Sequence, residues 1–363
     1  MIKLLVYIDN TISEYLSENQ LTNSQQALFS ELALAYRRGK LIVYGDVNSL
    51  DLIIKQLGEP SKSIFNRIRA RNPETGSIAA NVDKAIIISV HENPSEKQFL
   101  PKTLKGKEYY VTIDTACSWT WGLGCCLIAE SMADCKFYKY IGQYYCKQNK
   151  IRNAPIEYHF ESGGGRAIKD VFEKCVASDH IPTLCIVDSD MKWEKTNKYG
   201  DPPFGDTFRA TKKIAERLKR DHYGNQFEFV CLKCHEIENL IPISLLEQLD
   251  AGICSKDGLN IIKKLSEYEQ GNPILFYDFK NGVATHLSDQ CSYYWRDVFN
   301  HLQIPQNKEN CQVGCEHLLE RANDYIQIHS VAQIEVDDYL SVIWDDLGKT
   351  IFTWGCASAP MRA

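Results

Sequence analysis

The stretch Leu184-Cys185-Ile186-Val187-Asp188-Ser189-Asp190 places four apolar residues directly before two aspartates. A short continuous apolar run of this kind is typical of a strand that is buried on both faces. The aspartates then follow its carboxyl end, where open α/β sheets bind their ligands, and strand alternation predicts Asp188 and Asp190 on one face. Neighbouring carboxylates repel each other unless a hard cation such as Mg²⁺ joins them. The stretch therefore predicts a metal site, with a plain exposed turn as the alternative.

The composition is that of a globular protein. The 363 residues are 44% hydrophobic and 24% charged, with a formal net charge of −6, and this length suffices for two or three domains. This negative net charge excludes a protein whose whole surface is basic, although a local basic groove is enough to bind nucleic acid. No apolar run approaches membrane-spanning length, and the N-terminal run is too short for a signal peptide. We therefore expect a cytoplasmic protein with no membrane partner and with reduced cysteines.

Strand and helix patterns alternate over the first third of the chain and predict an α/β domain at residues 1–118. The expected strands are 2–8, 41–44, 85–90 and 109–113, and the expected helices are 24–38, 50–57 (capped by Asn48) and 61–71. Asp9, Asp46 and Asp114 each follow an apolar run, an arrangement that resembles PIN-type nucleases only faintly. We expect a scaffold or recognition domain here rather than a second acidic active site.

The alternation continues over residues 119–245 and brings polar residues to further strand ends. The expected strands are 123–130, 156–160, 184–187 and 227–232, and helices are expected to begin at 131, 166 and 207. Glu130 ends the first of these strands, three glycines (163–165) follow the second, and His-Glu-Ile-Glu-Asn (235–239) follows the last. Because the carboxyl ends of parallel strands lie on one edge of a sheet, these groups are expected to meet Asp188 and Asp190.

This order of motifs resembles the TOPRIM domain of topoisomerases, primases and OLD-like nucleases over roughly a third of the chain. The segment from Leu127 to Asp134 resembles the Glu-Gly-x-x-Asp motif, with Ser131 in place of the usual glycine. Asp188-Ser189-Asp190 resembles the Asp-x-Asp motif. Residues 235–239 are similar to the Glu-Asn element of OLD-like nucleases and of standalone TOPRIM effectors in phage defence. An alternative register uses Glu161, which lies too close to Asp188 in the sequence for an intervening strand.

The resemblance implies a central TOPRIM-like parallel sheet that binds one or two Mg²⁺ or Mn²⁺ ions. The metal ligands would be Glu130, Asp134, Asp188, Asp190 and Glu238, with Glu130, Asp188 and Asp190 as the catalytic residues. The metals would stabilise the attacking and leaving oxygens of phosphodiester cleavage. Glu130 would also act as a general acid or base.

Residues 207–220 have the pattern of a strongly basic helix. Lys212, Lys213 and Arg217, with Lys192 in the loop before the helix, are the expected contacts to a phosphate backbone. The alternative is a helix face that meets only solvent. No Gly-x-x-x-x-Gly-Lys-Ser/Thr motif appears, so any ATPase or sensor protein that acts with this chain must be a separate partner.

Residues 246–363 are predicted as a mainly helical C-terminal domain with one strand at 274–277. Cys231-x-x-Cys234-His235 formally matches a c-type haem attachment motif, which belongs to exported proteins and is rejected here. A zinc site could also be drawn from the cysteines and histidine at Cys231, Cys234, Cys311, Cys315 and His317. The spacing of that set is irregular, so free thiols are the preferred interpretation.

The sequence thus predicts a multi-domain α/β protein: a central TOPRIM-like parallel sheet flanked by an N-terminal α/β region and a mainly helical C-terminal region. The predicted activity is divalent-metal-dependent cleavage of DNA or RNA, as a toxic effector of anti-phage defence. Two alternatives stay open. One is a catalytically silent TOPRIM scaffold that binds nucleic acid or a partner protein, and the other is an enzyme of primase or topoisomerase type, which would need a zinc ribbon or nucleotidyl-transfer partners.

Overall fold

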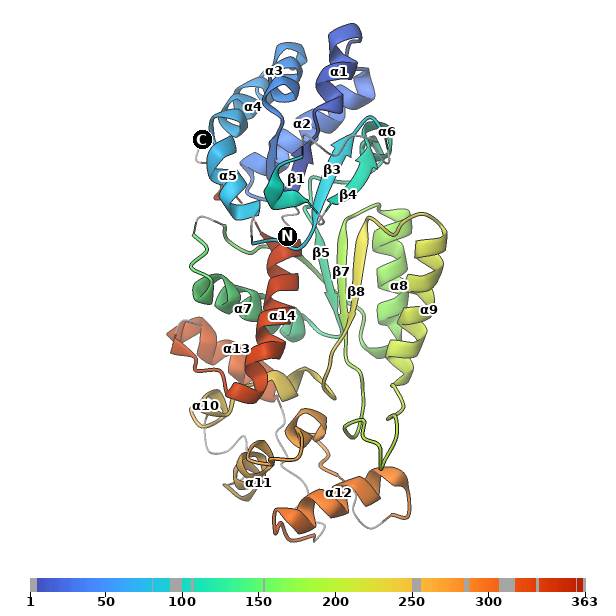
Figure 1. Ribbon diagram of the computed structural model, residues 1–363, viewed down its shortest axis with the longest axis vertical. Coiled ribbons are helices and arrows are strands. Elements are labelled where there is room, and N and C mark those ends of the chain that lie inside the picture. The colour runs from blue at the N-terminus through green and yellow to red at the C-terminus, as the bar shows by residue number, and fades with distance from the viewer. Residues whose placement is uncertain are drawn as a thin grey trace.

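The computed structural model describes residues 5–79, 81–91, 100–105, 108–152, 154–249, 256–283, 287–306, 317–330, 333–356 and 358–361. The molecule is elongated, with the N-terminal unit at one end, a second sheet in the middle and helices of the C-terminal region at the other end (Figure 1). Both sheets are parallel and have four strands each. The predicted α/β class is therefore confirmed.

The N-terminal unit is built on a sheet with the strand order β2-β1-β3-β4. Its strands are β1 (Leu5–Ile8), β2 (Ile42–Gly45), β3 (Ala85–Ser89) and β4 (Glu108–Thr112). Its helices are α1 (Thr11–Glu18), α2 (Asn23–Arg37), α3 (Val47–Gln56), α4 (Ser61–Ala70), α5 (Asn72–Ala79), the 3₁₀ turn η2 (Lys102–Leu104) and α6 (Ile113–Cys117). The four predicted strands are confirmed within the described residues, and residues 2–4 of the first prediction (2–8) lie outside them. Helix α3 begins three residues earlier than expected, because the side chain of Asp46, not Asn48, accepts a hydrogen bond from the Ser49 N–H at 2.9 Å.

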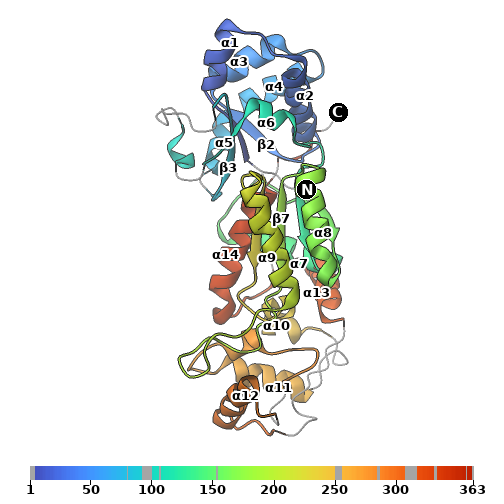
Figure 2. The ribbon, with the colours of Figure 1, turned by 90° about the vertical axis from the view of Figure 1, so that its right-hand side faces the viewer.

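The central sheet has the order β6-β5-β7-β8. Its strands are β5 (Cys126–Ala129), β6 (His159–Ser162), β7 (Thr183–Val187) and β8 (Phe227–Cys231), and its helices are α7 (Met132–Gln148), η3 (Gly165–Ala167), α8 (Ile168–Glu173), the π-helical turn η4 (Lys174–Ser178) and α9 (Asp206–Arg220). Helices α8 and α9 cover one face, and α7 with α14 (Asp338–Gly355) covers the other (Figures 1 and 2).

Strand β7 is buried on both faces, as its apolar run predicts. Cys185 and Val187 belong to the core under α8 and α9, whereas Leu184 and Ile186 belong to the large core on the other side of the sheet. Alternate side chains of β7 therefore pack into two different hydrophobic cores, one on each face of the sheet.

The C-terminal region is mainly helical. It contains η5 (Ile237–Leu240), α10 (Ile243–Leu246), α11 (Lys256–Ser266), η6 (Pro273–Phe276), α12 (Gln290–His301), α13 (Leu318–His329) and α14. The predicted strand at 274–277 is wrong, because residues 273–276 form the 3₁₀ turn η6, which is buried and pairs with none of the described strands. A short apolar run does not by itself distinguish a strand from a buried turn.

Helices α13 and α14 pack against α7 of the central unit. Gly348 of α14 lies so close to α7 that a Cβ atom there would come within 2.7 Å of Tyr145 Cβ. The chain end then reaches the N-terminal unit, where the Met361 N–H donates to the Arg37 carbonyl at 2.9 Å. The proposed boundaries at 118/119 and 245/246 stay predictions. No helix of the described ranges combines the length and the apolar character needed to cross a membrane.

Candidate metal centre

Glu130 stands at the carboxyl end of β5, where a glycine turn from the neighbouring strand packs against it. The Glu130 carbonyl accepts a hydrogen bond from the Gly164 N–H at 3.0 Å. Gly164 and Gly165 have φ values of +50° and +52°, which L side chains rarely adopt. A Cβ atom at Gly163 would lie 2.1 Å from the Ile168 Cα. The three glycines therefore permit the close turn between β6 and the helix that follows it.

A cavity of about 370 Å³ lies at this edge of the sheet. Four of the five predicted metal ligands line it: Glu130, Asp134, Asp188 and Glu238. Lys280 and residues 317–320, at the beginning of α13, also line the cavity. Strand ends from β5 and β7 and the turn η5 thus bring distant carboxylates to one cavity.

Burial and mutual repulsion raise the pKa values of carboxyl groups in this cluster. Burial, together with the charges of Asp190 and Asp134, raises the pKa of Glu130 to about 7. Burial and the Glu130 charge likewise raise the pKa of Asp188 well above its usual value. Raised carboxyl pKa values in one cavity are typical of a site that binds a cation or transfers protons.

Asp190 departs from the predicted arrangement. Strand β7 ends at Val187, and Asp190 has a φ value of 54°, so strand alternation no longer determines its direction. Its N–H donates to the His235 carbonyl at 2.9 Å. A Cβ atom at Gly205 would lie 1.8 Å from Asp190 Oδ2, so this carboxylate lies against the residue that precedes α9. Asp188 therefore lines the cavity. Asp190 lies beside the start of α9, and from there its negative charge contributes to the raised pKa of Glu130.

Asn239 joins the turn at residues 235–239 to a segment that the sequence did not connect with the site. Its Oδ1 accepts a hydrogen bond from the Glu236 N–H at 3.0 Å. Its Nδ2 donates to the carbonyl oxygens of Ile274 and Tyr277, both at 2.8 Å. The segment held in this way continues directly into Asp278 and Lys280. Asn239 is therefore a positioning residue.

Lys280 is a residue of the acidic cavity that sequence reasoning missed. Its Nζ lies 2.8 Å from Glu238 Oε1 and 3.0 Å from Glu236 Oε2. Although burial opposes it, the attraction of these two carboxylates raises the pKa of Lys280. The ammonium group is therefore a fixed positive charge within the carboxylate cluster. No local motif marks this lysine, because only the tertiary fold brings residue 280 beside residue 238.

His235, Glu236 and Asp278 form a further group whose potential ligand atoms all lie within 4.8 Å of one another. Asp278 Oδ1, however, accepts the N–H groups of Lys280 and Asn281 at 3.0 and 2.7 Å. Although burial opposes it, hydrogen bonds from His235 and Asn281 lower the pKa of Asp278 to about 2. Asp278 therefore stabilises the turn that carries Lys280 by accepting these hydrogen bonds.

The donor set of the cavity fits a hard divalent cation. Glu238 is 6% exposed, and its Oε2 is buried without a hydrogen-bond partner among the described residues. An orphaned buried carboxylate oxygen is costly unless a cation or a proton compensates it. With Glu130 and Asp188, Glu238 could supply the oxygen ligands that Mg²⁺ and Mn²⁺ prefer.

Asp134 and Glu161 have local roles that the sequence did not reveal. The Asp134 carboxylate accepts the Ser131 N–H at 2.9 Å, and the Ser131 hydroxyl accepts the Asp134 N–H at 3.1 Å, which forms a capping box at the start of α7. Asp134 therefore serves the helix end whether or not it binds metal. Glu161 lies on the edge strand β6, where its Oε1 is 3.0 Å from His159 Nε2.

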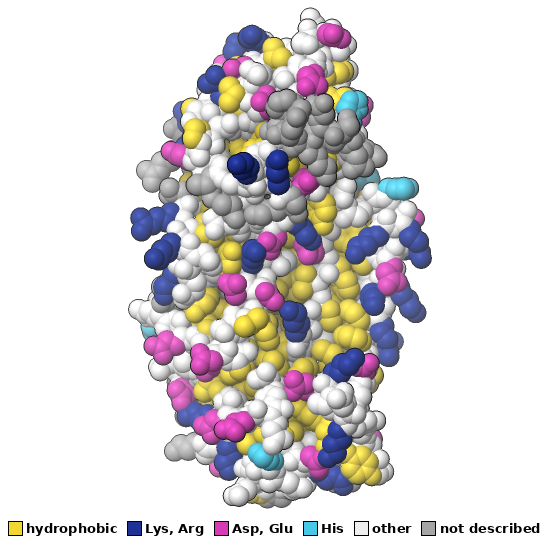
Figure 3. All heavy atoms as spheres, viewed as in Figure 1, with side chains coloured by type: hydrophobic (Ala, Val, Ile, Leu, Met, Phe, Trp, Pro, Cys, Tyr) yellow, Lys and Arg dark blue, Asp and Glu magenta, His cyan; other side chains and the backbone are white. Residues whose placement is uncertain are grey.

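The basic helix α9 is amphipathic. Phe208, Thr211, Ala215 and Leu218 are buried, whereas Lys212 and Lys213 are exposed. Lysine and arginine side chains gather over α9 at the right-hand side of the view in Figure 3. Lys192, in the loop before the helix, is also exposed. Arg217 differs from the other predicted contacts, because its Nη2 lies 2.5 Å from Glu173 Oε2 of α8.

The remaining sequence candidates do not form a second site in the described part of the chain. Cys231 and Cys234 are free thiols, as are the other cysteines of the described ranges. Cys311 and Cys315 lie outside the described residues, and His317 lines the acidic cavity. The aspartates of the N-terminal unit have structural contacts: Asp46 caps α3, and Asp9 accepts the Thr11 N–H at 3.0 Å.

Comparisons with known proteins do not assign this chain to a family. No family model matches it, and no curated protein matches it. Among solved structures, the structure of DsGPDH of Dunaliella salina matches with a TM-score of 0.17 and 11% sequence identity, covering 95% of this chain and 85% of that chain. At this TM-score the likeness carries no argument about fold or function.

Proposed function

We propose that this chain is a cytoplasmic, divalent-metal-dependent nuclease of TOPRIM type that cleaves phosphodiester bonds in DNA or RNA. The observation that carries the proposal is the cavity in which Glu130, Asp188 and Glu238 converge, with the buried Glu238 Oε2 lacking a partner among the described residues. The proposed role as an effector of anti-phage defence rests on the sequence resemblance to TOPRIM effectors alone.

The residues of the cavity suit this chemistry. Bound Mg²⁺ or Mn²⁺ would supply Lewis-acid stabilisation of the attacking and leaving oxygens. Glu130, Asp188 and Glu238 would hold the metal. In the metal-free protein the pKa of Glu130 is about 7, so where this carboxyl group does not coordinate the metal it would accept or release a proton near neutral pH. Lys280 and the exposed lysines of α9 would attract the phosphate backbone.

Lys280 also favours a second candidate function, a catalytically silent scaffold. Its ammonium group already compensates Glu236 and Glu238, and this charge reduces the need for a metal ion. A scaffold of this kind would bind nucleic acid through α9 without cleaving it.

One experiment separates the two functions. The pure protein is incubated with pools of DNA and RNA in the presence of Mg²⁺, Mn²⁺ or EDTA, and the products are resolved by length. A nuclease should cut at least one pool with metal and leave it intact in EDTA. Binding without cleavage under every metal condition would favour the scaffold.

A further inference from the structure

A second cavity, of about 710 Å³, lies between the N-terminal unit, the loop after α7 and the C-terminal tail. It sits at the opposite end of α7 from the acidic centre, because Asp134 lies in the first turn of this helix and Asn149 follows its last residue. A helix of this length spans about 25 Å. The cavity is therefore separate from the metal centre.

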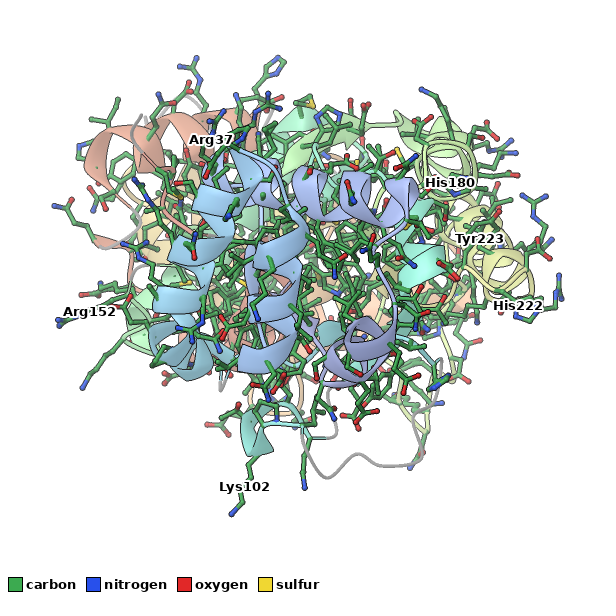
Figure 4. All side chains as sticks on the ribbon, turned by 90° about the horizontal axis from the view of Figure 1, so that it is seen from above. Arg37, Lys102, Arg152, His180, His222 and Tyr223 are labelled. Atoms are coloured by element: carbon green, nitrogen blue, oxygen red, sulfur yellow. The ribbon has the colours of Figure 1, made fainter. Side chains whose placement is uncertain are left out.

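The charge of this cavity is opposite to that of the acidic centre. Arg71, Lys150 and Arg152 line it together with one carboxylate, Glu74. Within the described ranges, none of the three cations has an ion-pair partner. They lie exposed at the rim, and Figure 4 shows the Arg152 side chain extending outward from the molecule. This local excess of positive charge stands out in a chain whose net charge is −6.

The walls of the cavity are held by hydrogen bonds between distant parts of the chain. The Ser358 hydroxyl donates to the Tyr36 carbonyl at 3.0 Å and fixes the C-terminal tail against the N-terminal unit. In the loop after α7, the Ile151 N–H donates to the Cys146 carbonyl at 2.8 Å, and Lys150 has a φ value of 53°. The cations on this loop are therefore presented by a fixed backbone.

We propose that this cavity binds a nucleotide through its 5′-phosphate group, either as a free nucleoside phosphate or as the phosphorylated end of a nucleic acid strand. Guanidinium and ammonium groups are the side chains that bind phosphate oxygens most strongly. Ile78 and Ile151 are half-buried in its wall and offer apolar surface for a base or ribose. The Thr75 hydroxyl and the Asn149 amide also line the cavity, where they donate to the carbonyl oxygens of Arg71 and Tyr145 at 3.2 and 3.1 Å. The volume lies within the range of small-molecule sites, about 300–1,000 Å³. This binding needs no metal ion.

The test measures nucleotide binding in EDTA, so that no metal–nucleotide complex can occupy the acidic centre. The probes are ATP, inorganic pyrophosphate and one single-stranded oligonucleotide with either a 5′-phosphate or a 5′-hydroxyl group, each titrated by calorimetry. The cavity variant is Arg71→Gln with Arg152→Gln. The matched control is Lys62→Gln with Arg67→Gln, which removes the same charge from exposed positions of α4 outside the cavity. Thermal unfolding verifies that both variants fold.

We expect the cavity variant to bind the ligand about tenfold more weakly or worse, since each phosphate loses charge-assisted hydrogen bonds, while the control binds like the wild type. Binding of ATP with competition by pyrophosphate would identify a free nucleotide as the ligand. Binding of the 5′-phosphorylated but not the 5′-hydroxyl oligonucleotide would identify a strand end. If neither ATP nor the phosphorylated strand binds, or if both double variants weaken binding equally, the proposal is overturned.

Discussion

Lys280 and Glu238 form an ion pair inside the acidic cavity, with 2.8 Å between Nζ and Oε1. Oε2 of the same glutamate is buried without a hydrogen-bond partner in the described part of the chain. One carboxylate group thus has one oxygen compensated by a side chain of the protein and one oxygen left for another cation. Lys280 and a bound metal ion would therefore compete for the same carboxylates, and each cation would weaken the binding of the other to them.

Replacing Lys280 by glutamine should lower the stability of the metal-free protein by about 1 kcal/mol, a small loss because the side chain of Lys280 is 49% exposed and its charge is screened. The same change should increase the gain in Tm on adding Mn²⁺, because the carboxylates lose a competing cation. Thermal unfolding in EDTA and in Mn²⁺ measures both effects.

A matched control for this variant is Lys349→Gln, which removes an ion pair with Asp83 outside the acidic cavity (Nζ to Oδ1 2.7 Å). The control should unfold with the Mn²⁺ gain of the wild type. If Lys280→Gln also leaves the Mn²⁺ gain unchanged, Lys280 does not share its carboxylates with a metal.

The metal-free protein should lose stability as the pH rises through the titration of Glu130. The pKa of Glu130 is about 7 in the folded protein, compared with 4.5 for an ordinary glutamate. The folded protein therefore keeps a proton that the unfolded chain has released, and this contribution to stability is present below about pH 4.5 and is lost as the pH rises through about 7. Urea unfolding in EDTA across this window should show a smaller loss for Glu130→Gln than for the wild type. The Glu161→Gln variant should lose as much stability across this pH window as the wild type. If both variants change the pH dependence of stability equally, the loss is not due to the titration of Glu130.

Most strands of the two sheets could be predicted because they contain a short apolar run. Strand β6 (His-Phe-Glu-Ser) is the exception: the apolar pattern predicted it at 156–160, whereas it forms at 159–162 and its side chains are only half-buried. Hydrophobic burial dominates such segments, so β7 needs little tertiary information to be recognised. The turn η6 shows the limit of this reasoning. Its apolar residues 274–276 are also buried, but they pair with none of the strands that the structure describes, and the side chain of Asn239 donates to the Ile274 carbonyl.

The candidate site could be predicted only in part. Glu130 and Asp188 follow directly from strand ends, because the edge of a parallel sheet is a consequence of its topology. The direction of Asp190 depends on a left-handed backbone conformation after the strand, which the pattern of the sequence does not specify. Lys280 reaches the cavity through the contacts of Asn239 with a distant segment, and no spacing rule connects the two.

Adding a methyl group at Gly205 should displace Asp190. The Cβ atom of Gly205→Ala would meet Asp190 Oδ2 at 1.8 Å, although the backbone at Gly205 (φ −64°) suits alanine. We expect the variant to fold and to lose most of any metal-dependent cleavage, because Asp190 would no longer lie beside Glu130. Gly58→Ala is the control, since a Cβ atom there has no neighbour within 4 Å. Full cleavage by Gly205→Ala would show that the placement of Asp190 is not required.

Reversing the charges of Lys212 and Lys213 should weaken nucleic acid binding uniformly across sequences. Each phosphate contact that is lost should reduce the slope of log K against log salt by about 0.9 for duplex DNA. Arg217→Glu should behave differently, because it breaks the ion pair with Glu173 and leaves that carboxylate without its partner, so its main effect should be on stability. Titrations at several salt concentrations, with thermal unfolding of each variant, separate these outcomes. Unchanged binding by the double lysine variant would mean that this face of α9 meets only solvent.

The assignment of the catalytic carboxylates is tested by three isosteric variants. Asp188→Asn and Glu130→Gln each remove one charge from the cavity, so both should abolish cleavage and weaken Mn²⁺ binding while the metal-free protein keeps or gains stability, because a repulsion between buried carboxylates is relieved. Glu161→Gln should cleave nearly normally, since Glu161 lies on the edge strand beside His159. Nuclease turnover and the Tm with and without Mn²⁺ are measured for all three. An inactive Glu161→Gln with an active Glu130→Gln would move the site to β6, and full activity of all three variants would place the chemistry elsewhere in the chain.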